Sequence, residues 1–144
     1  MEAYRHRPGI LHFAGHGDDR SLSFISDQGL LVSETPLIAE RLASILLNFP
    51  ERTRLCVLNT CDSASVAKHL VDTHATEAAV GWPGKLADAE AITFSGAFYG
   101  RLGDGLTLAQ SVTLAAKSLG VEKAPILYTN EGVDPDIIYV SRKD

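Results

Sequence analysis

The feature that most constrains the fold is a continuous apolar run, Leu55-Cys-Val-Leu58, within the strand-like segment 54–59. A strand with one face in water alternates apolar and polar residues, whereas a strand buried on both faces is apolar throughout. The run therefore predicts a central strand of a parallel sheet. Such a sheet needs helices on both faces, so the run indicates an α/β architecture.

Strand-like and helical segments alternate along the rest of the chain, as a parallel sheet requires. Glycine, proline and capping residues mark their ends: Thr35 and Pro36 open one helix, and Thr107 and Gln110 form a capping box. Helices are predicted at residues 36–50, 64–73, 88–102 and 108–120. Strands are predicted at residues 9–14, 22–25, 29–32, 54–59, 77–82, 125–129 and 136–140. The predicted fold is a three-layer α/β sandwich with a mostly parallel sheet.

Length and composition narrow the class of protein. With 144 residues the chain is expected to form a single domain, residues 1–144. The net charge of -5 and the lack of a Lys/Arg cluster argue against nucleic acid as a partner. No apolar run approaches the roughly 18 residues that cross a bilayer, which argues against a membrane span. Two cysteines are too few for a disulfide scaffold and favour a cytoplasmic protein.

The chain enters its first strand unusually early. Only a polar stub, residues 1–8, precedes that strand. A doubly wound sheet normally has a strand and a helix before its centre. We therefore expect either a fragment of a longer protein or a minimal version of the fold that lacks the first strand.

Two reactive side chains follow predicted strands. His16 comes after the strand at 9–14, between Gly15 and Gly17, and Cys61 comes after the apolar strand. In open α/β sheets, functional groups gather at the carboxyl ends of the strands, and neighbouring strands are about 4.8 Å apart. A helix N-terminus beside Cys61 favours its thiolate, and His16 can take the proton. The N–H groups of Gly17 and Cys61 are candidate oxyanion donors.

The motifs around these residues resemble those of a known family. His12-Phe-Ala-Gly-His-Gly17, then Val57-Leu-Asn-Thr-Cys-Asp-Ser-Ala64, then Ala79-Val-Gly-Trp-Pro83 with the helices after it are similar to the CHAT family. This family belongs to the caspase-like, separase-related clan of cysteine peptidases. The resemblance implies a caspase-like sheet, a His16–Cys61 dyad, and an oxyanion hole that involves Gly17, with Gly15 shaping the turn. It also implies a protein or peptide substrate and a sensing or regulatory module as partner.

Four further residues are candidates for the substrate pocket. Relatives that cut after Arg or Lys place an aspartate two residues before the nucleophile, where this chain has Asn59. The difference argues against a basic-residue preference, although Asp62 or Asp88 could supply charge from another direction. Trp82 is expected either to border the cleft or to pack in the core, and the cleft edge is favoured. Asp62 is also expected to cap the following helix, as is Ser63.

Structural interpretations compete with the prediction of a catalytic site. Cys56 lies within the apolar run and is expected to be a core residue. His12 is four positions before His16, about 13 Å along a strand, which argues against a metal between them. Neither a metal nor another cofactor is predicted. The first hypothesis is a cysteine endopeptidase; the alternatives are a non-catalytic caspase-like interaction module and, last, a nucleotide-binding module.

Overall fold

The computed structural model describes residues 9–17, 21–24, 37–50, 53–120 and 124–136. The described elements in chain order are β1 (Ile10–Gly17), β2 (Ser21–Phe24), β3 (Leu37–Ile38), α2 (Ala39–Leu47), β4 (Thr53–Asn59), α3 (Ala64–Asp72), β5 (Thr76–Gly81), α4 (Asp88–Gly103), α5 (Leu108–Lys117) and β6 (Ile126–Thr129). Within these ranges, no helix is both long enough and apolar enough to cross a membrane.

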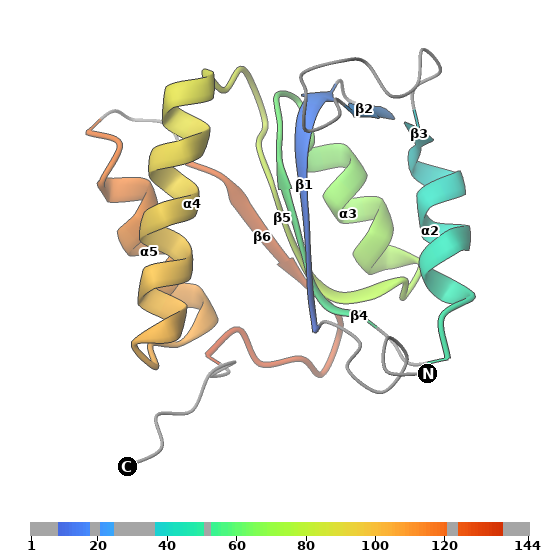
Figure 1. The fold of residues 1–144 in the computed structure, drawn as a ribbon. Helices are drawn as coiled ribbons and strands as arrows, with labels where there is room; N and C mark the ends of the chain where they lie inside the picture. Colours follow the sequence, from blue (N-terminus) through green and yellow to red (C-terminus); the bar gives the residue numbers. More distant parts are fainter. Residues whose placement is uncertain (1–8, 18–20, 25–36, 51–52, 121–123, 137–144) are drawn as a thin grey trace, which may run out of the picture.

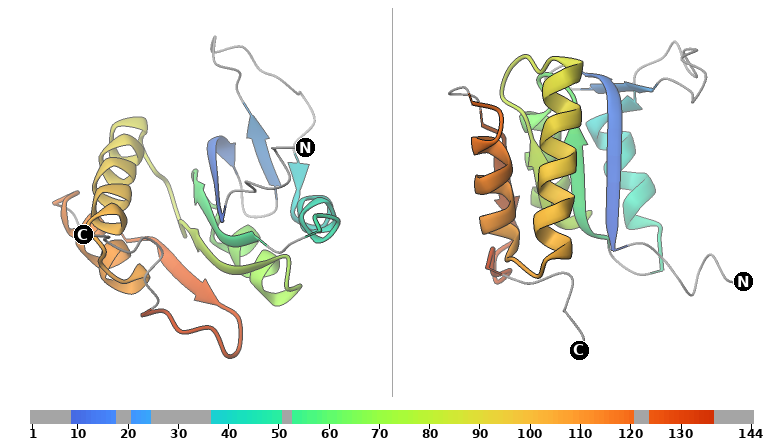
Figure 2. Two further views of the ribbon diagram at one scale, coloured as in Figure 1. Left: turned by 60° about the horizontal axis from the view of Figure 1, so that its bottom comes forward. Right: turned by 60° about the vertical axis from the view of Figure 1, so that its left-hand side comes forward.

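One sheet forms the middle layer of the molecule, with the strand order β3-β2-β1-β4-β5-β6. Its central strands β1, β4 and β5 are parallel, whereas β6 is antiparallel to β5. The short strands β2 and β3 extend it by antiparallel pairing at the end of β1. Helices α2 and α3 cover one face and α4 and α5 the other (Figures 1 and 2). The three-layer α/β sandwich expected from the sequence is confirmed.

The central strand β4 is buried as its apolar run predicts. The side chains of residues 55–58 are fully buried. Leu55 and Val57 pack into the core beneath α4 and α5, while Cys56 and Leu58 pack into the core beneath α2 and α3. Adjacent residues of a strand point to opposite faces, so each core takes every second side chain of the run. A single strand thereby holds both outer layers to the sheet.

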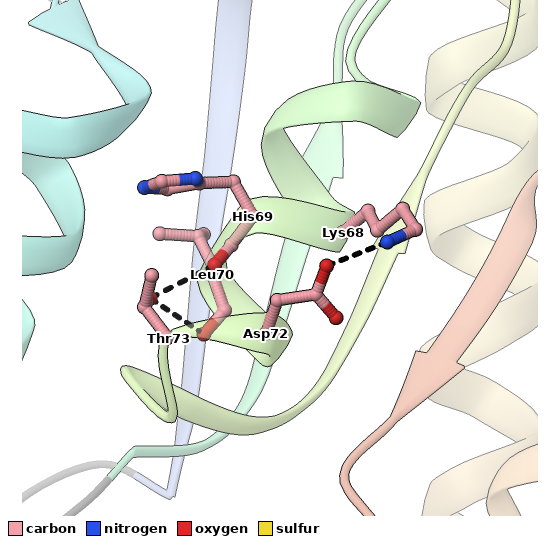
Figure 3. A network of polar contacts seen from close by, with 5 residues as sticks. All are labelled: Lys68, His69, Leu70, Asp72 and Thr73. Atoms are coloured by element: carbon pink, nitrogen blue, oxygen red, sulfur yellow. Dashed lines mark hydrogen bonds and ion pairs between the residues drawn. The ribbon is translucent and has the colours of Figure 1, made fainter.

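Helix α3 follows β4 and leads into β5. Its last turn is closed by Thr73, whose Oγ1 donates to the carbonyls of His69 at 2.8 Å and Leu70 at 3.3 Å (Figure 3). On its outer surface, Lys68 pairs with Asp72 at 2.6 Å. Because both of these side chains are exposed, the pair adds little stability. The helix is held by its buried face, which packs against the sheet.

The predicted elements differ from the structure mainly around residues 35–38. Leu37 and Ile38 pair with Leu22 and Ser21 as β3, so the helix begins at Ala39 rather than near Pro36. The two apolar residues fit the helical spacing of the sequence, but their backbone pairs with β2 and so belongs to the sheet. Thr35, Pro36 and the strand predicted at 29–32 lie outside the described residues, as does all but the first residue of the strand predicted at 136–140.

The capping box that the sequence predicts for α5 is confirmed. The N–H of Gln110 donates to Thr107 Oγ1 at 3.1 Å, and the N–H of Thr107 donates to Gln110 Oε1 at 3.0 Å. Two of the N–H groups that a helix start leaves without partners are satisfied in this way. Gly120, near the predicted end, has a positive φ of 69°, which suits the residue after a helix.

The end of β5 lies close to the start of α3, and Gly81 permits this approach. A Cβ atom at residue 81 would lie 2.7 Å from Ser63 O, 2.9 Å from Ala64 Cα and 2.9 Å from Ala67 Cβ. Two of these three atoms belong to the backbone, so a side chain at position 81 would push the two segments apart. Gly81 therefore sets the spacing between the end of β5 and the turn that carries Cys61.

We expect Gly81→Ala to lower the free energy of unfolding by about 1–3 kcal/mol, because the added methyl overpacks this contact. The control is Gly100→Ala within α4, where an added Cβ meets nothing within 4 Å. That change should raise the stability by about 0.5–1 kcal/mol through helix propensity. Urea denaturation followed by circular dichroism measures both. Equal stability of the two variants would contradict the proposed contact.

Candidate functional site

The register of the two central strands relates His16 to Cys61. In the parallel pairing of β1 with β4, every residue of β1 is opposite the residue 45 positions later, up to Ala14 opposite Asn59. His16 and Cys61 are also 45 positions apart, each two residues beyond that last pair. Cys61 therefore lies in the turn after β4, at the same edge of the sheet as His16. His16 does not follow its strand as expected, because β1 runs beyond Ala14 to Gly17 through its pairing with β2.

The structure describes the backbone of β1 through Gly17. There, His16 is opposite Ser23 and Gly17 is opposite Leu22 of β2. The side chain of His16 lies outside the described part of the structure. The proton transfer between His16 and Cys61 accordingly stays a prediction, as does the role of Gly17 in an oxyanion hole. Gly15, expected to shape a turn, lies within β1 opposite Phe24.

Cys61 is the first residue of the turn after β4, and its side chain is partly exposed. Its Sγ accepts a hydrogen bond from the N–H of Leu86 at 3.1 Å and donates one to the carbonyl of Leu86 at 3.3 Å. The other cysteine, Cys56, is completely buried, and this burial raises the pKa of its thiol far above the ordinary value. Of the two cysteines, only Cys61 can therefore meet a substrate from solution.

The turn that carries Cys61 is fixed to the chain that leaves β5. The N–H of Asp62 donates to Gly84 O at 2.9 Å, and the N–H groups of Ser63 and Ala64 donate to Trp82 O at 2.8 and 2.9 Å. Asp62 itself has a positive φ of 50°, a conformation in which aspartate is tolerated better than most residues. The start of α3 is thus satisfied by backbone carbonyls of the neighbouring loop.

Ser63 has a different role from the one expected. It occupies the position before α3, but its side chain makes no capping hydrogen bond. Its buried hydroxyl lies 3.0 Å from Leu58 O and 2.8 Å from Thr60 O, and accepts from the N–H of Trp82 at 3.0 Å. Because Trp82 O already binds the helix start, the hydroxyl is free to connect β4 with β5 instead.

Asn59 is 5% exposed and its amide is fully engaged. Its Nδ2 donates to Ala91 O at 2.8 Å and to Ser95 Oγ at 2.7 Å, both in α4. Its Oδ1 accepts from the indole N–H of Trp82 at 3.2 Å. An amide can make all three bonds at once, whereas a carboxylate could not donate to α4. Asn59 therefore ties the end of β4 to both α4 and β5.

Trp82 is completely buried rather than at the edge of a cleft. Its ring packs edge-on against Phe94, with centroids 5.2 Å apart. The preference for a cleft position was wrong, because β5 carries this side chain beneath α4, where its N–H finds Asn59. The packing interpretation of Trp82 is the one that the structure supports.

The two acidic candidates lie at starts of helices. Asp62 is partly exposed in the turn before α3, and Asp88 is exposed in the first turn of α4. Glu90, in the same turn of α4, accepts from the N–H of Ala87 at 2.9 Å. Carboxylates stabilise helix N-termini, so a structural role accounts for Asp88 without a substrate. Among the described residues, no group of three or more His, Cys, Asp and Glu is placed to hold a metal ion.

Sequence reasoning missed a contact between His12 and Tyr99. The Nδ1 atom of His12 lies 2.7 Å from the Tyr99 hydroxyl, and the two rings meet edge-on with centroids 5.6 Å apart. Desolvation beside α4 lowers the pKa of His12 and raises that of Tyr99. A neutral imidazole is the natural acceptor for the phenol proton. The pair joins β1 to α4, as Asn59 joins β4 to α4.

Comparison with models of protein families and with curated protein sequences returned no match for this chain. The resemblance to the CHAT family therefore rests on the residues of the motifs around His16 and Cys61.

We expect Asn59→Asp to lower the free energy of unfolding by about 2 kcal/mol or more at pH 7, because it buries a charge that cannot donate to Ala91 O. Part of this loss should return near pH 4, since burial raises a carboxyl pKa and the protonated acid can donate. Ser95→Ala removes only one partner and should cost about 0.5–1.5 kcal/mol. Urea denaturation at both pH values tests this; a pH-independent loss would contradict the reasoning.

The His12 ring should titrate below 6.5 in NMR spectra of the native protein. Because its pKa is lower in the folded than in the unfolded chain, its contribution to stability is complete above about pH 6.5 and is lost as pH falls through the folded value. Desolvation causes the shift, so Tyr99→Phe should keep the pKa below 6.5 while removing the hydrogen bond. A native pKa at or above 6.5 would refute the assignment.

Proposed function

We propose that this chain is a cysteine peptidase domain in which Cys61 is the nucleophile and His16 the general base. The observation that supports it most is the β1–β4 register, which relates the two residues by the same offset as every described pair of that ladder. The partial exposure of Cys61, beside the start of α3, also supports it. A thiol at a helix N-terminus is favoured as thiolate.

The proposed reaction proceeds through an acyl-enzyme. The Cys61 thiolate attacks the scissile carbonyl carbon, and the N–H groups of Cys61 and Gly17 bind the oxyanion that forms. The C–N bond then breaks as the protonated His16 gives its proton to the leaving amine. His16 next takes a proton from water, whose oxygen attacks the thioester and releases the thiolate. No metal or cofactor takes part in these steps.

The proposed substrate is a protein or peptide without a strict requirement for Arg or Lys before the cut. Asn59, at the position where an aspartate would attract a basic side chain, is neutral and binds Ala91, Ser95 and Trp82. Asn59 therefore has no charge to attract a cationic side chain, and its amide atoms are already hydrogen-bonded within the domain. Cleavage of a peptide library, mapped by mass spectrometry, measures this preference directly.

The biological setting is part of the proposal. By its resemblance to the CHAT family, the chain is proposed to be a regulated effector domain that works in the cytoplasm with a sensing module. The cysteine content is compatible with a reducing compartment.

Cys61→Ala should abolish peptide cleavage while leaving the fold intact, because the side chain is only partly buried. His16→Ala should reduce the rate by about 10²–10⁴, the usual contribution of a general base. Cys56→Ala is the matched control: it removes the same atom from the chain's other cysteine and should cut normally if folded. Cleavage that survives Cys61→Ala would refute the proposed nucleophile.

A second candidate is a non-catalytic interaction module with the same fold. The hydrogen bonds of Cys61 Sγ with the backbone N–H and carbonyl of Leu86 favour the interaction module, because they give the thiol a structural role. Peptide cleavage distinguishes the two, because an interaction module cuts no peptide, whereas a peptidase cuts and loses its activity in Cys61→Ala.

A further inference from the structure

A short backbone segment between β5 and α4 covers one side of the Cys61 thiol. We call residues 84–87 the Leu86 segment. Gly84 O accepts from the N–H of Asp62, and the N–H of Ala87 donates to Glu90 Oε1, so both ends of the segment are held. Between these ends, the N–H and carbonyl of Leu86 both bind Cys61 Sγ.

This double contact suits a thiol better than a thiolate. As a thiol, Cys61 accepts from the Leu86 N–H at 3.1 Å and donates its proton to the Leu86 carbonyl at 3.3 Å. After loss of the proton, the N–H contact would strengthen, but the negative sulfur would face the negative end of the carbonyl dipole. The carbonyl of Leu86 therefore holds the proton that must pass to His16 before nucleophilic attack.

The side chain of Leu86 anchors the backbone N–H and carbonyl that bind the sulfur. It is 7% exposed and belongs to the core beneath α4 and α5. The residues beside it, Lys85 and Ala87, are exposed, and a Cβ atom at Gly84 would meet nothing within 4 Å. The segment thus faces open space at Gly84 and is held in the core by one apolar side chain, that of Leu86. Such a segment can be displaced without unpacking the rest of the core.

We propose that the Leu86 segment is an autoinhibitory latch, which holds Cys61 as a neutral, shielded thiol until the segment moves away. This inference rests on the proposed function, because it describes the regulation of the same nucleophile. When the segment shifts, the sulfur loses the carbonyl contact and becomes open to solvent, and its proton can pass to His16. The chain would then cut slowly at rest and faster once residues 84–87 are displaced.

The test is the rate at which iodoacetamide alkylates Cys61 in the full chain at pH 7, mapped by mass spectrometry. Leu86→Ala removes the anchor and should raise this rate about fivefold, the factor expected when a hydrogen bond of ordinary net strength is lost. The matched control is Leu102→Ala, which removes the same atoms from the same core at a residue of α4. Its rate should stay within about twofold of the original. Cys56, completely buried, reports global unfolding within each sample.

An unchanged or slower rate in Leu86→Ala would overturn the latch, and a slower rate would mean that the Leu86 N–H activates the sulfur. An equal rise in Leu102→Ala would overturn it too, since general loosening would then be the cause. If Cys56 is labelled in Leu86→Ala, that variant has unfolded and a second measurement decides.

The second measurement is amide exchange at Leu86. The exchange rate should rise about fivefold in Cys61→Ala and stay slow in Cys61→Ser, which keeps an acceptor. Exchange unaffected by Cys61→Ala would overturn the latch.

Failure of the latch differs from failure of the proposed function. A Leu86→Ala chain that shows the expected faster alkylation but cuts no peptide retains the latch and loses the peptidase assignment. A chain whose cleavage requires Cys61 but whose alkylation ignores Leu86→Ala is a peptidase without this latch.

Discussion

The hydrogen-bonded ladder between β1 and β4 is the interaction on which the rest of the molecule depends. It joins segments about 45 residues apart in sequence and fixes one register between them. A shift of one residue would turn the apolar side chains of a strand to the opposite face. Because β4 supplies both cores, such a shift would disturb both helical layers. The positions of His16 and Cys61 follow from the same register, so stability and proposed chemistry share one constraint.

Polar side chains then fix the outer layers to this ladder at particular points. Asn59 and His12 connect β4 and β1 with α4, and Ser63 connects β4 with β5. Asn59 and Ser63 are buried and paired, which stabilises only the correct arrangement, because an unpaired polar group in such a place is costly. The contact of His12 with Tyr99 lies at a more exposed position. The edge of the sheet at Cys61 is therefore rigid on the side of α3 and β5. Within the described part of the chain, the thiol is hydrogen-bonded to the backbone N–H and carbonyl of Leu86.

Most of the fold could be predicted because local patterns agree with the tertiary structure. The apolar run at 55–58, the capping box at Thr107 and the alternation of helices with strands all led to the observed elements. The strand at Leu37 and Ile38 could not be predicted, because pairing with β2 overrides a helical pattern. Trp82 and Asn59 were expected near a pocket, whereas their hydrogen bond inside the core depends on how α4 lies over the sheet. That geometry leaves no local signal in the sequence, and neither does the contact between Leu86 and Cys61.

The placement of the chain's two cysteine sulfur atoms in different layers has a consequence for oxidative chemistry. Cys56 points into the core beneath α2 and α3, whereas Cys61 packs at the margin of the other core. Their positions within and beyond one extended strand are too far apart for a disulfide, which needs Cα atoms within about 7 Å. A sulfenic acid formed on Cys61 would therefore find no resolving cysteine in its own chain. Its reduction would depend on an external thiol such as glutathione.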